Sequence, residues 1–355
     1  MRSVFAWHRP LMTVAALMAL SALVCLVGLL VDQREVTGVD AWLKPLKFSL
    51  SILVYSVTWA WLIAHLPRWR RAAHITGTVI AVALVVEQAA IVGAAAAGVT
   101  SHFNVSTPFA IAVWGVMAVS ITVLYVCTFV TTVFVCFLRL PTRSLTVAVR
   151  AGAVLALVGI GLAYLMTSPT TSQLNDFQGI AGAHTVGLAD GGPGLPLLGW
   201  STVAGDLRLP HFVGMHALQL LPLFAILVGW LGGRWRMLAD DRVRVRLVVV
   251  ATAAYAATLV LVTVQALSGE SIVRPTGVFL AGGWLILGGS LAAVAAILVD
   301  GARRGQAAPA TDGLVDVGVT HDLPALRGGE AIGVPAAEVI AVGLGQRAQR
   351  TDDDQ

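Results

Sequence analysis

Charged side chains are scarce in this sequence. Asp, Glu, Lys and Arg together make up 12% of the 355 residues, whereas 57% are hydrophobic and the mean hydropathy is +0.83. This composition excludes a soluble globular protein, because such a chain has too little polar surface to face water. Lipid is the solvent that it favours.

Several signature motifs are also absent. The sequence has no phosphate-binding glycine loop followed by Lys and Ser or Thr, no Gly-x-Ser-x-Gly, no His-Glu-x-x-His and no Cys-x-x-Cys-His. No common hydrolase or covalent-haem motif therefore points to a function. Cysteine is rare as well, and Cys25, Cys127 and Cys136 all fall in apolar stretches, where they are expected to pack as small hydrophobes.

Apolar stretches long enough to cross a bilayer recur along the chain. A hydrocarbon core of roughly 30 Å needs about 20 apolar residues in a helix. The sequence predicts eight such helices, near residues 11–31, 47–65, 75–98, 108–138, 149–167, 211–232, 247–267 and 276–299. The first is longer than a typical signal-peptide core and ends without a small-x-small cleavage site, so it is expected to remain as a helix. The expected fold class is an all-α integral membrane protein, a bundle of about eight transmembrane helices.

Basic residues are distributed unevenly between the connections. With a cytoplasmic amino terminus, 18 of the 23 Lys and Arg residues fall in cytoplasmic segments. The outer segments contain only Arg34, Lys44, Lys47, Arg208 and Arg274. The positive-inside rule therefore predicts that both termini are cytoplasmic, in a multi-pass protein of the cell membrane, of the bacterial inner-membrane type. Because topology explains the basicity, no nucleic-acid partner is expected.

Two long segments lie outside the predicted spans. Residues 301–355 are dominated by Gly, Ala, Asp, Arg and Pro without any period, which predicts a disordered cytoplasmic tail after a transmembrane domain of residues 1–300. The outer loop 168–210 contains apolar residues such as Phe177 and Trp200 together with turn residues at 190–194. It is expected to fold back over the helix ends as a lid.

Four of the eight histidines are predicted at the outer face. His102 follows the third span, His184 lies in the outer loop, and His211 and His216 lie at the start of the sixth span. Histidine binds transition metals and haem iron, so these four are candidate metal ligands. His211 and His216 lie about 140° apart around an ideal helix, so they can share one ion only if the first turn is distorted.

The sixth span contains two further polar features below His216. Gln219 lies on the same helical face, and Pro222 leaves the carbonyl of Leu218 without its usual partner, which predicts a kink. Two interpretations remain open for His216 and Gln219. They contact a cofactor, or they are polar contacts between helices.

Glu87 lies midway through the third predicted span. An unpaired carboxylate at that depth costs several kcal/mol, so Glu87 should be protonated, paired, or facing a hydrated cavity. The functional hypotheses are a catalytic proton relay, a cation site or support for a ligand. The structural alternative is a hydrogen bond to neighbouring helices.

Lys44 and Lys47 lie at the outer mouth of the second span, against the charge bias of the other loops. Snorkelling to lipid headgroups explains such lysines. The alternative is that they bind an anionic group beneath the lid, such as a quinone oxygen, a carboxylate or a haem propionate. Arg208 and Asp206 either join that site or pair with each other.

Several of these segments resemble one known group of proteins. They are Lys44-Pro45-Leu46-Lys47-Phe48, Ser101-His102-Phe103-Asn104, the run from Asp190 to Pro196, and Gly205-Asp206-Leu207-Arg208 with His211 and His216. They look like an uncharacterised family of bacterial multi-pass membrane proteins, over residues 1 to about 300. The resemblance implies a polytopic membrane fold, and it implies no activity and no catalytic residue.

Three functions remain open from the sequence. The first is a metal or haem site for redox chemistry at the outer face, and the second is a proton-coupled transporter in which Glu87 titrates. The third is a non-catalytic assembly factor or sensor whose lid binds a partner.

Overall fold

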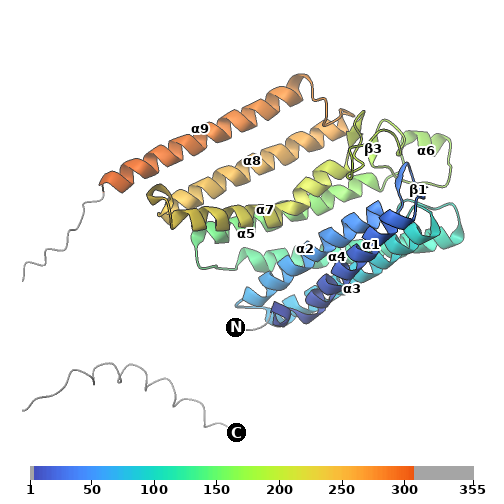
Figure 1. Cartoon of the computed structure of the whole chain (residues 1–355), viewed down its shortest axis with the longest axis horizontal. Coiled ribbons are helices and arrows are strands. Elements are labelled where there is room, and N and C mark those ends of the chain that lie inside the picture. Colours follow the sequence, from blue (N-terminus) through green and yellow to red (C-terminus); the bar gives the residue numbers. More distant parts are fainter. Residues whose placement is uncertain (1–3, 308–355) are drawn as a thin grey trace, which may run out of the picture. The chain divides into compact units, whose positions relative to one another are not determined.

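A computed structural model describes residues 4–307 of the chain (Figure 1). Within them, eight helices are long and apolar enough to cross a membrane. They are α1 (Arg9–Val31), α2 (Leu43–His65), α3 (Arg70–Ala97), α4 (Pro108–Cys136), α5 (Arg143–Leu162), α7 (Arg208–Gly232), α8 (Asp241–Leu267) and α9 (Gly277–Ala307). The protein is a multi-pass helical membrane protein, which confirms the eight predicted spans. The predicted tail lies outside the described residues from residue 308 onward.

Side-chain caps explain where several of these helices begin. Thr107 Oγ1 accepts the Ala110 N–H at the start of α4, with Pro108 in the first turn, and Thr142 and Asp240 do the same for α5 and α8. His8 caps α1, because its Nδ1 accepts the Leu11 N–H. These acceptors satisfy backbone donors that a helix start leaves without partners.

The helices pack in two groups (Figure 1). In one, α1, α2, α3 and α4 pack on one another, and in the other α5 packs against α7 and α8, while α9 packs along α8. The largest buried cluster spans both groups, since Trp59 and Ile80 of the first belong to the same core as Val149 and Leu218 of the second. The core therefore lies where the two groups meet.

Glycine allows α5 and α7 to approach closely. A Cβ placed on Gly159 would lie within 3.0 Å of backbone atoms of Gly214 and Met215, and one on Gly152 would lie 2.7 Å from the Ala217 carbonyl oxygen. Small residues at a helix contact permit this packing in membranes. The contact fixes the position of α7, which carries His211 and His216.

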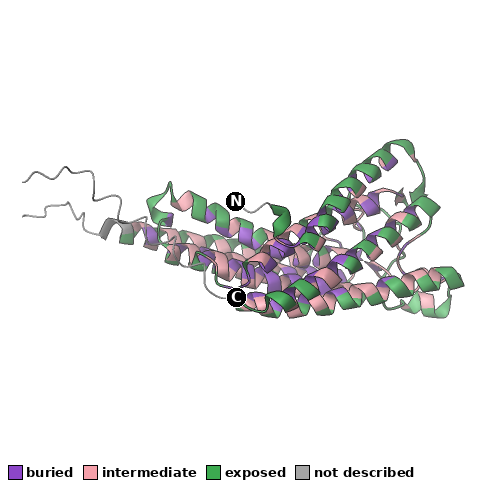
Figure 2. Cartoon of the chain, turned by 90° about the horizontal axis from the view of Figure 1, so that it is seen from below, coloured by how far each residue is buried: buried purple, intermediate pink, exposed green. Residues whose placement is uncertain are grey.

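The outward faces of the helices are apolar. Leu30, Phe109, Val278 and Leu285 are between 75% and 81% exposed, and in Figure 2 the exposed residues line the outward sides of the helices. Exposed apolar surface of this extent is unfavourable in water and is solvated by lipid chains. The pattern supports the assignment of the helices to a bilayer.

The connections at one end of the bundle are structured, and we call it the loop-rich end. It consists of residues 32–42, 98–107, 163–207 and 268–276. Strand β1 (Glu35–Val36) pairs antiparallel with β2 (Val39–Asp40), and β3 (Thr185–Val186) pairs antiparallel with β4 (Gly205–Asp206). The short helix α6 (Thr171–Asn175) and the 3-10 turn at Ala163–Met166 lie in the same long connection. Two further 3-10 turns, at Val4–Ala6 and Arg236–Leu238, lie outside the loop-rich end.

The connection from 163 to 207 folds onto the neighbouring loops. The Ala181 N–H donates to the Phe103 carbonyl, and the Val105 N–H donates to the Gly179 carbonyl, both over 2.8 Å. Gly38, in the turn between β1 and β2, lies against the Gly191 carbonyl. These contacts hold the long connection against the 98–107 loop and the turn between β1 and β2.

Candidate functional site

Glu87 of α3 faces the histidine of the neighbouring loop. Its Oε1 lies 3.5 Å from His102 Nε2, and the Glu87 side chain is only 7% exposed. On the other side of the ring, Lys44 Nζ of α2 lies 3.2 Å from His102 Nδ1, and Ser101 Oγ lies 2.9 Å from the same nitrogen. An ammonium, an imidazole and a carboxylate thus form one row at the loop-rich end.

The chemistry of the row fixes the tautomer of His102. A lysine ammonium has donors only, so Nδ1 must accept, and in a neutral ring the proton then lies on Nε2, toward Glu87. Burial lowers the pKa of His102 well below its usual value, and nearby Lys44, His184 and His211 lower it further. His102 is therefore neutral at pH 7 and suited to pass a proton between its two nitrogens.

The second carboxylate oxygen of Glu87 is left without a partner. Oε2 is buried and has no hydrogen bond within residues 4–307. The adjacent Gln88 also has a buried oxygen, Oε1, without a partner in these residues, but its Nε2 lies within hydrogen-bond distance of Ser49 Oγ, the Pro45 carbonyl and Ser21 Oγ. Gln88 therefore ties α1, α2 and α3 together, a structural role that its place in the sequence did not suggest.

His184 is paired within the long loop. Its Nδ1 lies 2.6 Å from Asp190 Oδ2, and the backbone N–H groups of His184 and Thr185 donate to the same carboxylate. Burial lowers the pKa of His184, more than the hydrogen bond to Asp190 raises it. Burial acts to raise the pKa of Asp190, but the bonds from His184 and Thr185 outweigh it and hold that pKa well below its usual range. At neutral pH a neutral imidazole thus donates to a carboxylate, and this pair fixes residues 184–190 of the long connection.

Lys47 and Arg208 contact a short hairpin of the same loop, residues 194–201. The hairpin closes through the bridge between Gly194 and Ser201. Lys47 Nζ donates to the Leu198 carbonyl over 2.8 Å, and Arg208 Nη2 donates to the Gly199 carbonyl over 2.6 Å. Arg208 also pairs with the buried carboxylate of Asp206, with 2.6 Å between Nη2 and Oδ2. Arg208 therefore pairs with Asp206, and it contacts the same hairpin as Lys47.

The remaining candidate ligands are engaged separately. His211 Nδ1 donates to the Gly159 carbonyl over 2.8 Å, whereas His216 packs edge-on against Phe212 and its buried Nε2 has no partner within the described residues. Gln219 donates to Thr58 Oγ1 over 3.4 Å, which links α7 to α2. Among residues 4–307, no group of three or more His, Cys, Asp or Glu side chains is arranged to hold a metal ion.

Comparison with known proteins does not identify a family. The chain matches no protein-family model, no curated protein and no solved structure. The resemblance to a bacterial membrane family thus remains an expectation, and the functional argument rests on the residues themselves.

Two pairs of hydroxyl groups lie between α2, α3 and α4. Tyr55 OH and Thr128 Oγ1 are 2.7 Å apart, and Thr76 Oγ1 and Thr131 Oγ1 are 3.0 Å apart. Further buried polar atoms on the same helices, which have no partner in the described part of the chain, are Ser56 Oγ, Trp59 Nε1 and Thr132 Oγ1. Sequence reasoning missed these pairs because a single hydroxyl in a span is ordinary. Only the packing of α4 against α2 and α3 brings the groups together.

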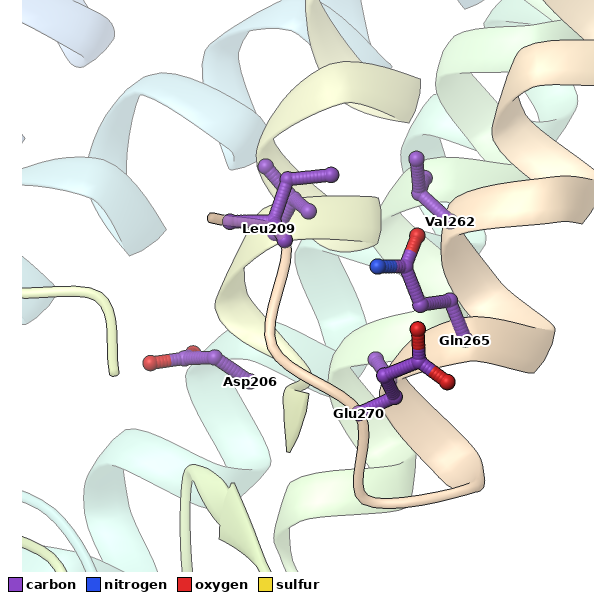
Figure 3. A pocket seen from close by; sticks show the side chains of 7 residues that line it. Asp206, Leu209, Val262, Gln265 and Glu270 are labelled. Carbon is purple, nitrogen blue, oxygen red and sulfur yellow. The ribbon is translucent and has the colours of Figure 1, made fainter. Parts of the chain in front are cut away.

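A small pocket lies elsewhere at the loop-rich end, between the start of α7 and the end of α8 (Figure 3). Its polar groups are satisfied locally, since Gln265 Nε2 donates to the Ser271 carbonyl and Glu270 accepts the Thr276 N–H. The Asp206 carboxylate points away from Gln265 and Glu270 in Figure 3. This pocket therefore lacks converging reactive groups.

Proposed function

We propose that the protein is a proton-coupled membrane carrier in which Glu87 takes up and releases the proton. The observation that carries the proposal is the row of Lys44, His102 and Glu87. An acidic side chain inside a membrane span is a frequent feature of proton relays. The unpaired Oε2 supports this role, because a buried carboxyl that is not held by a full set of donors can exist in either protonation state.

The row provides a route for one proton. Lys44 gives a proton to His102 Nδ1, and the ring releases its Nε2 proton to the Glu87 carboxylate. A hydronium ion of the solution then gives its proton to Lys44 and leaves as water. One N–H bond forms and one breaks at the ring, so His102 ends neutral with its proton on Nδ1, and the ring must turn over before the next transfer. The hydroxyl pairs Tyr55–Thr128 and Thr76–Thr131 are the proposed second route for the proton, toward the opposite end of the bundle.

The orientation in the membrane is part of the proposal. The connections at the opposite end of the bundle, 66–69, 137–142 and 233–240, contain or adjoin most of the arginines, whereas the loop-rich end has only five basic residues. By the positive-inside rule the loop-rich end faces the outside of the cell, and Glu87 exchanges protons with that side through His102.

Infrared difference spectroscopy tests whether Glu87 titrates. Purified protein in lipid is taken through a pH step, and the stretching band of a buried carboxylic acid is recorded. We expect this band in the wild type and not in Glu87→Gln. In His102→Gln, the pH midpoint at which the band appears should shift. The matched control is Glu35→Gln, because Glu35 is an exposed glutamate at the same end of the bundle. A band that persists unchanged in Glu87→Gln would remove Glu87 as the proton site.

A second hypothesis, the metal or haem site, rests on one observation. The buried Nε2 of His216 has no partner in the described part of the chain, and neither does Oε1 of Gln219 one helical turn away. An imidazole left in this state is available to a ligand. Metal analysis and the visible spectrum of the purified protein test the hypothesis, which requires stoichiometric metal or a haem band that disappears in His216→Ala. Wild-type protein without either would leave His216 as a helix contact.

A further inference from the structure

Cationic groups converge beneath the 194–201 hairpin. Lys47 Nζ and Arg208 Nη1 each lie 4.0 Å from the point that a Cβ on Gly199 would occupy. Lys44 is near enough to both to interact with them electrostatically. Arg208 has Asp206 as its counter-ion, but within residues 4–307 neither lysine forms a salt bridge with a carboxylate. Half-buried ammonium groups without an anion are costly, because the lost hydration is not replaced.

These cations also lie where helix dipoles oppose them. Lys44 is in the first turn of α2, Lys47 is in the next turn, and Arg208 is the first residue of α7. Neither helix has an acidic residue in its first turn. The start of α2 has no side-chain cap, whereas at α7 the Asp206 carboxylate accepts the backbone N–H of Arg208. A helix amino terminus carries partial positive charge and favours anions. Because Asp206 pairs with Arg208, the cations at these helix ends that form no salt bridge within residues 4–307 are Lys44 and Lys47, on the side of the bundle that has few basic residues.

The hairpin supplies the oxygens that these cations bind. The Leu198 and Gly199 carbonyls accept from Lys47 and Arg208, respectively. Leu197, beside them, has a φ of 62° and is 74% exposed, so a bulky residue is held in the left-handed region at the tip of the hairpin without burying its side chain. This conformation is strained for leucine. The hairpin therefore occupies the cationic site in a conformation that an incoming ligand can relieve.

We propose that Lys47 and Arg208, beneath the 194–201 hairpin, bind an oxyanion, the carboxylate or phosphate group of a small solute or of a lipid headgroup. Its oxygens replace the Leu198 and Gly199 carbonyls, and the hairpin moves aside. Two oxygens on one anionic group match two neighbouring cationic donors, and charge-assisted bonds are stronger than bonds to neutral carbonyls. Lys44 contributes long-range attraction while it remains bonded to His102.

For the carrier, this site defines the class of substrate, and that step rests on the proposed function. The charged side chains near the site are Lys44, Lys47, Arg208, Asp206, Asp190 and Glu87, with His102 and His184 neutral. Three cations and three carboxylates balance when Glu87 is ionised, and one positive charge is in excess when Glu87 is protonated. Binding of one monoanion at Lys47 and Arg208 then restores neutrality. The proposed carrier therefore transports one proton together with one monoanion. Binding of the oxyanion itself does not require Glu87 to titrate.

Binding is measured on the purified full-length protein in detergent. The thermal midpoint is followed against sodium acetate or sodium phosphate, with sodium chloride at equal ionic strength as reference, which gives an apparent Kd. A second arm compares nanodiscs with and without phosphatidylglycerol. The variants are Lys47→Gln, Lys47→Arg, Leu197→Gly, and Arg274→Gln as an exposed cation at the same end.

We expect a saturable shift with one oxyanion. The affinity of the protein for this oxyanion should fall about tenfold or more in Lys47→Gln, because one charge-assisted bond is lost. The affinity should be retained in Lys47→Arg and in Arg274→Gln. Leu197→Gly removes the backbone strain of the closed hairpin and leaves both cations unchanged. Displacing the hairpin then gains less free energy, so the affinity for the oxyanion should fall about tenfold. This variant replaces Lys47→Gln in the test if Lys47→Gln does not fold. A shift with phosphatidylglycerol and none with acetate or phosphate assigns the site to a lipid headgroup.

No shift with any oxyanion beyond chloride, or equal shifts in Lys47→Gln and Lys47→Arg, would overturn the site. Either result leaves the Glu87 infrared band untouched. Conversely, if the infrared band persists in Glu87→Gln while the oxyanion still shifts the thermal midpoint, only the proton coupling is overturned.

Discussion

Replacement of Gly159 by alanine should separate α5 from α7. The added Cβ would lie within 3.0 Å of the Gly214 and Met215 backbone, whereas ordinary contacts are 3.4–4 Å. Backbone atoms cannot rotate away, so the two helices must move apart. Overpacking of this kind costs about 1–3 kcal/mol, and the better helix propensity of alanine offsets about 1 kcal/mol at most. The Gly159 carbonyl also accepts from His211 Nδ1, so this bond should lengthen.

Gly229→Ala is the matched control. Gly229 lies on α7, is exposed, and a Cβ there would meet nothing within 4 Å. Both variants gain the same helix propensity, so the difference between them isolates the contact and should be about 1–3 kcal/mol. The assay is the thermal midpoint in detergent, followed by the intrinsic fluorescence of the ten tryptophans. A Gly159→Ala midpoint equal to or above that of Gly229→Ala would refute the close helix contact.

Three further outcomes are expected. Because the pKa of His184 is lowered in the folded protein, the folded state binds fewer protons than the unfolded state below about pH 6.5. The thermal midpoint should therefore fall between about pH 7 and pH 5, and fall less in His184→Gln, whereas an identical decline in both proteins would contradict the buried neutral ring. Acetate should bind more tightly as the pH decreases in the wild type but not in Glu87→Gln, as measured from titrations at several pH values; parallel curves would separate anion binding from the proton. Cysteines at Thr100 and Ser268 should react with an impermeant thiol reagent from outside intact cells, and labelling of Arg143→Cys instead would reverse the proposed orientation.

The sequence alone determined the class of the protein and its eight helices. Hydropathy is a local property, and a helix in lipid satisfies its own backbone, so length and composition were sufficient. The predicted boundary of the second span was late by four residues, because Leu43 begins α2 and places both Lys44 and Lys47 within the helix. Charged residues at a helix start lower the local hydropathy, which hides the first turn.

The tertiary structure decided which polar residues meet. Glu87 and His102 were both identified as candidates from the sequence, but as members of different hypothetical sites, and only the packing of the 98–107 loop on α2 and α3 brings them together with Lys44. Among the four histidines predicted as candidate metal ligands, His184 contacts Asp190 and His211 contacts a backbone carbonyl, partners that the sequence did not indicate. Sequence places a residue at a depth in the membrane, whereas its partner depends on the rotation and contact of helices distant in the chain.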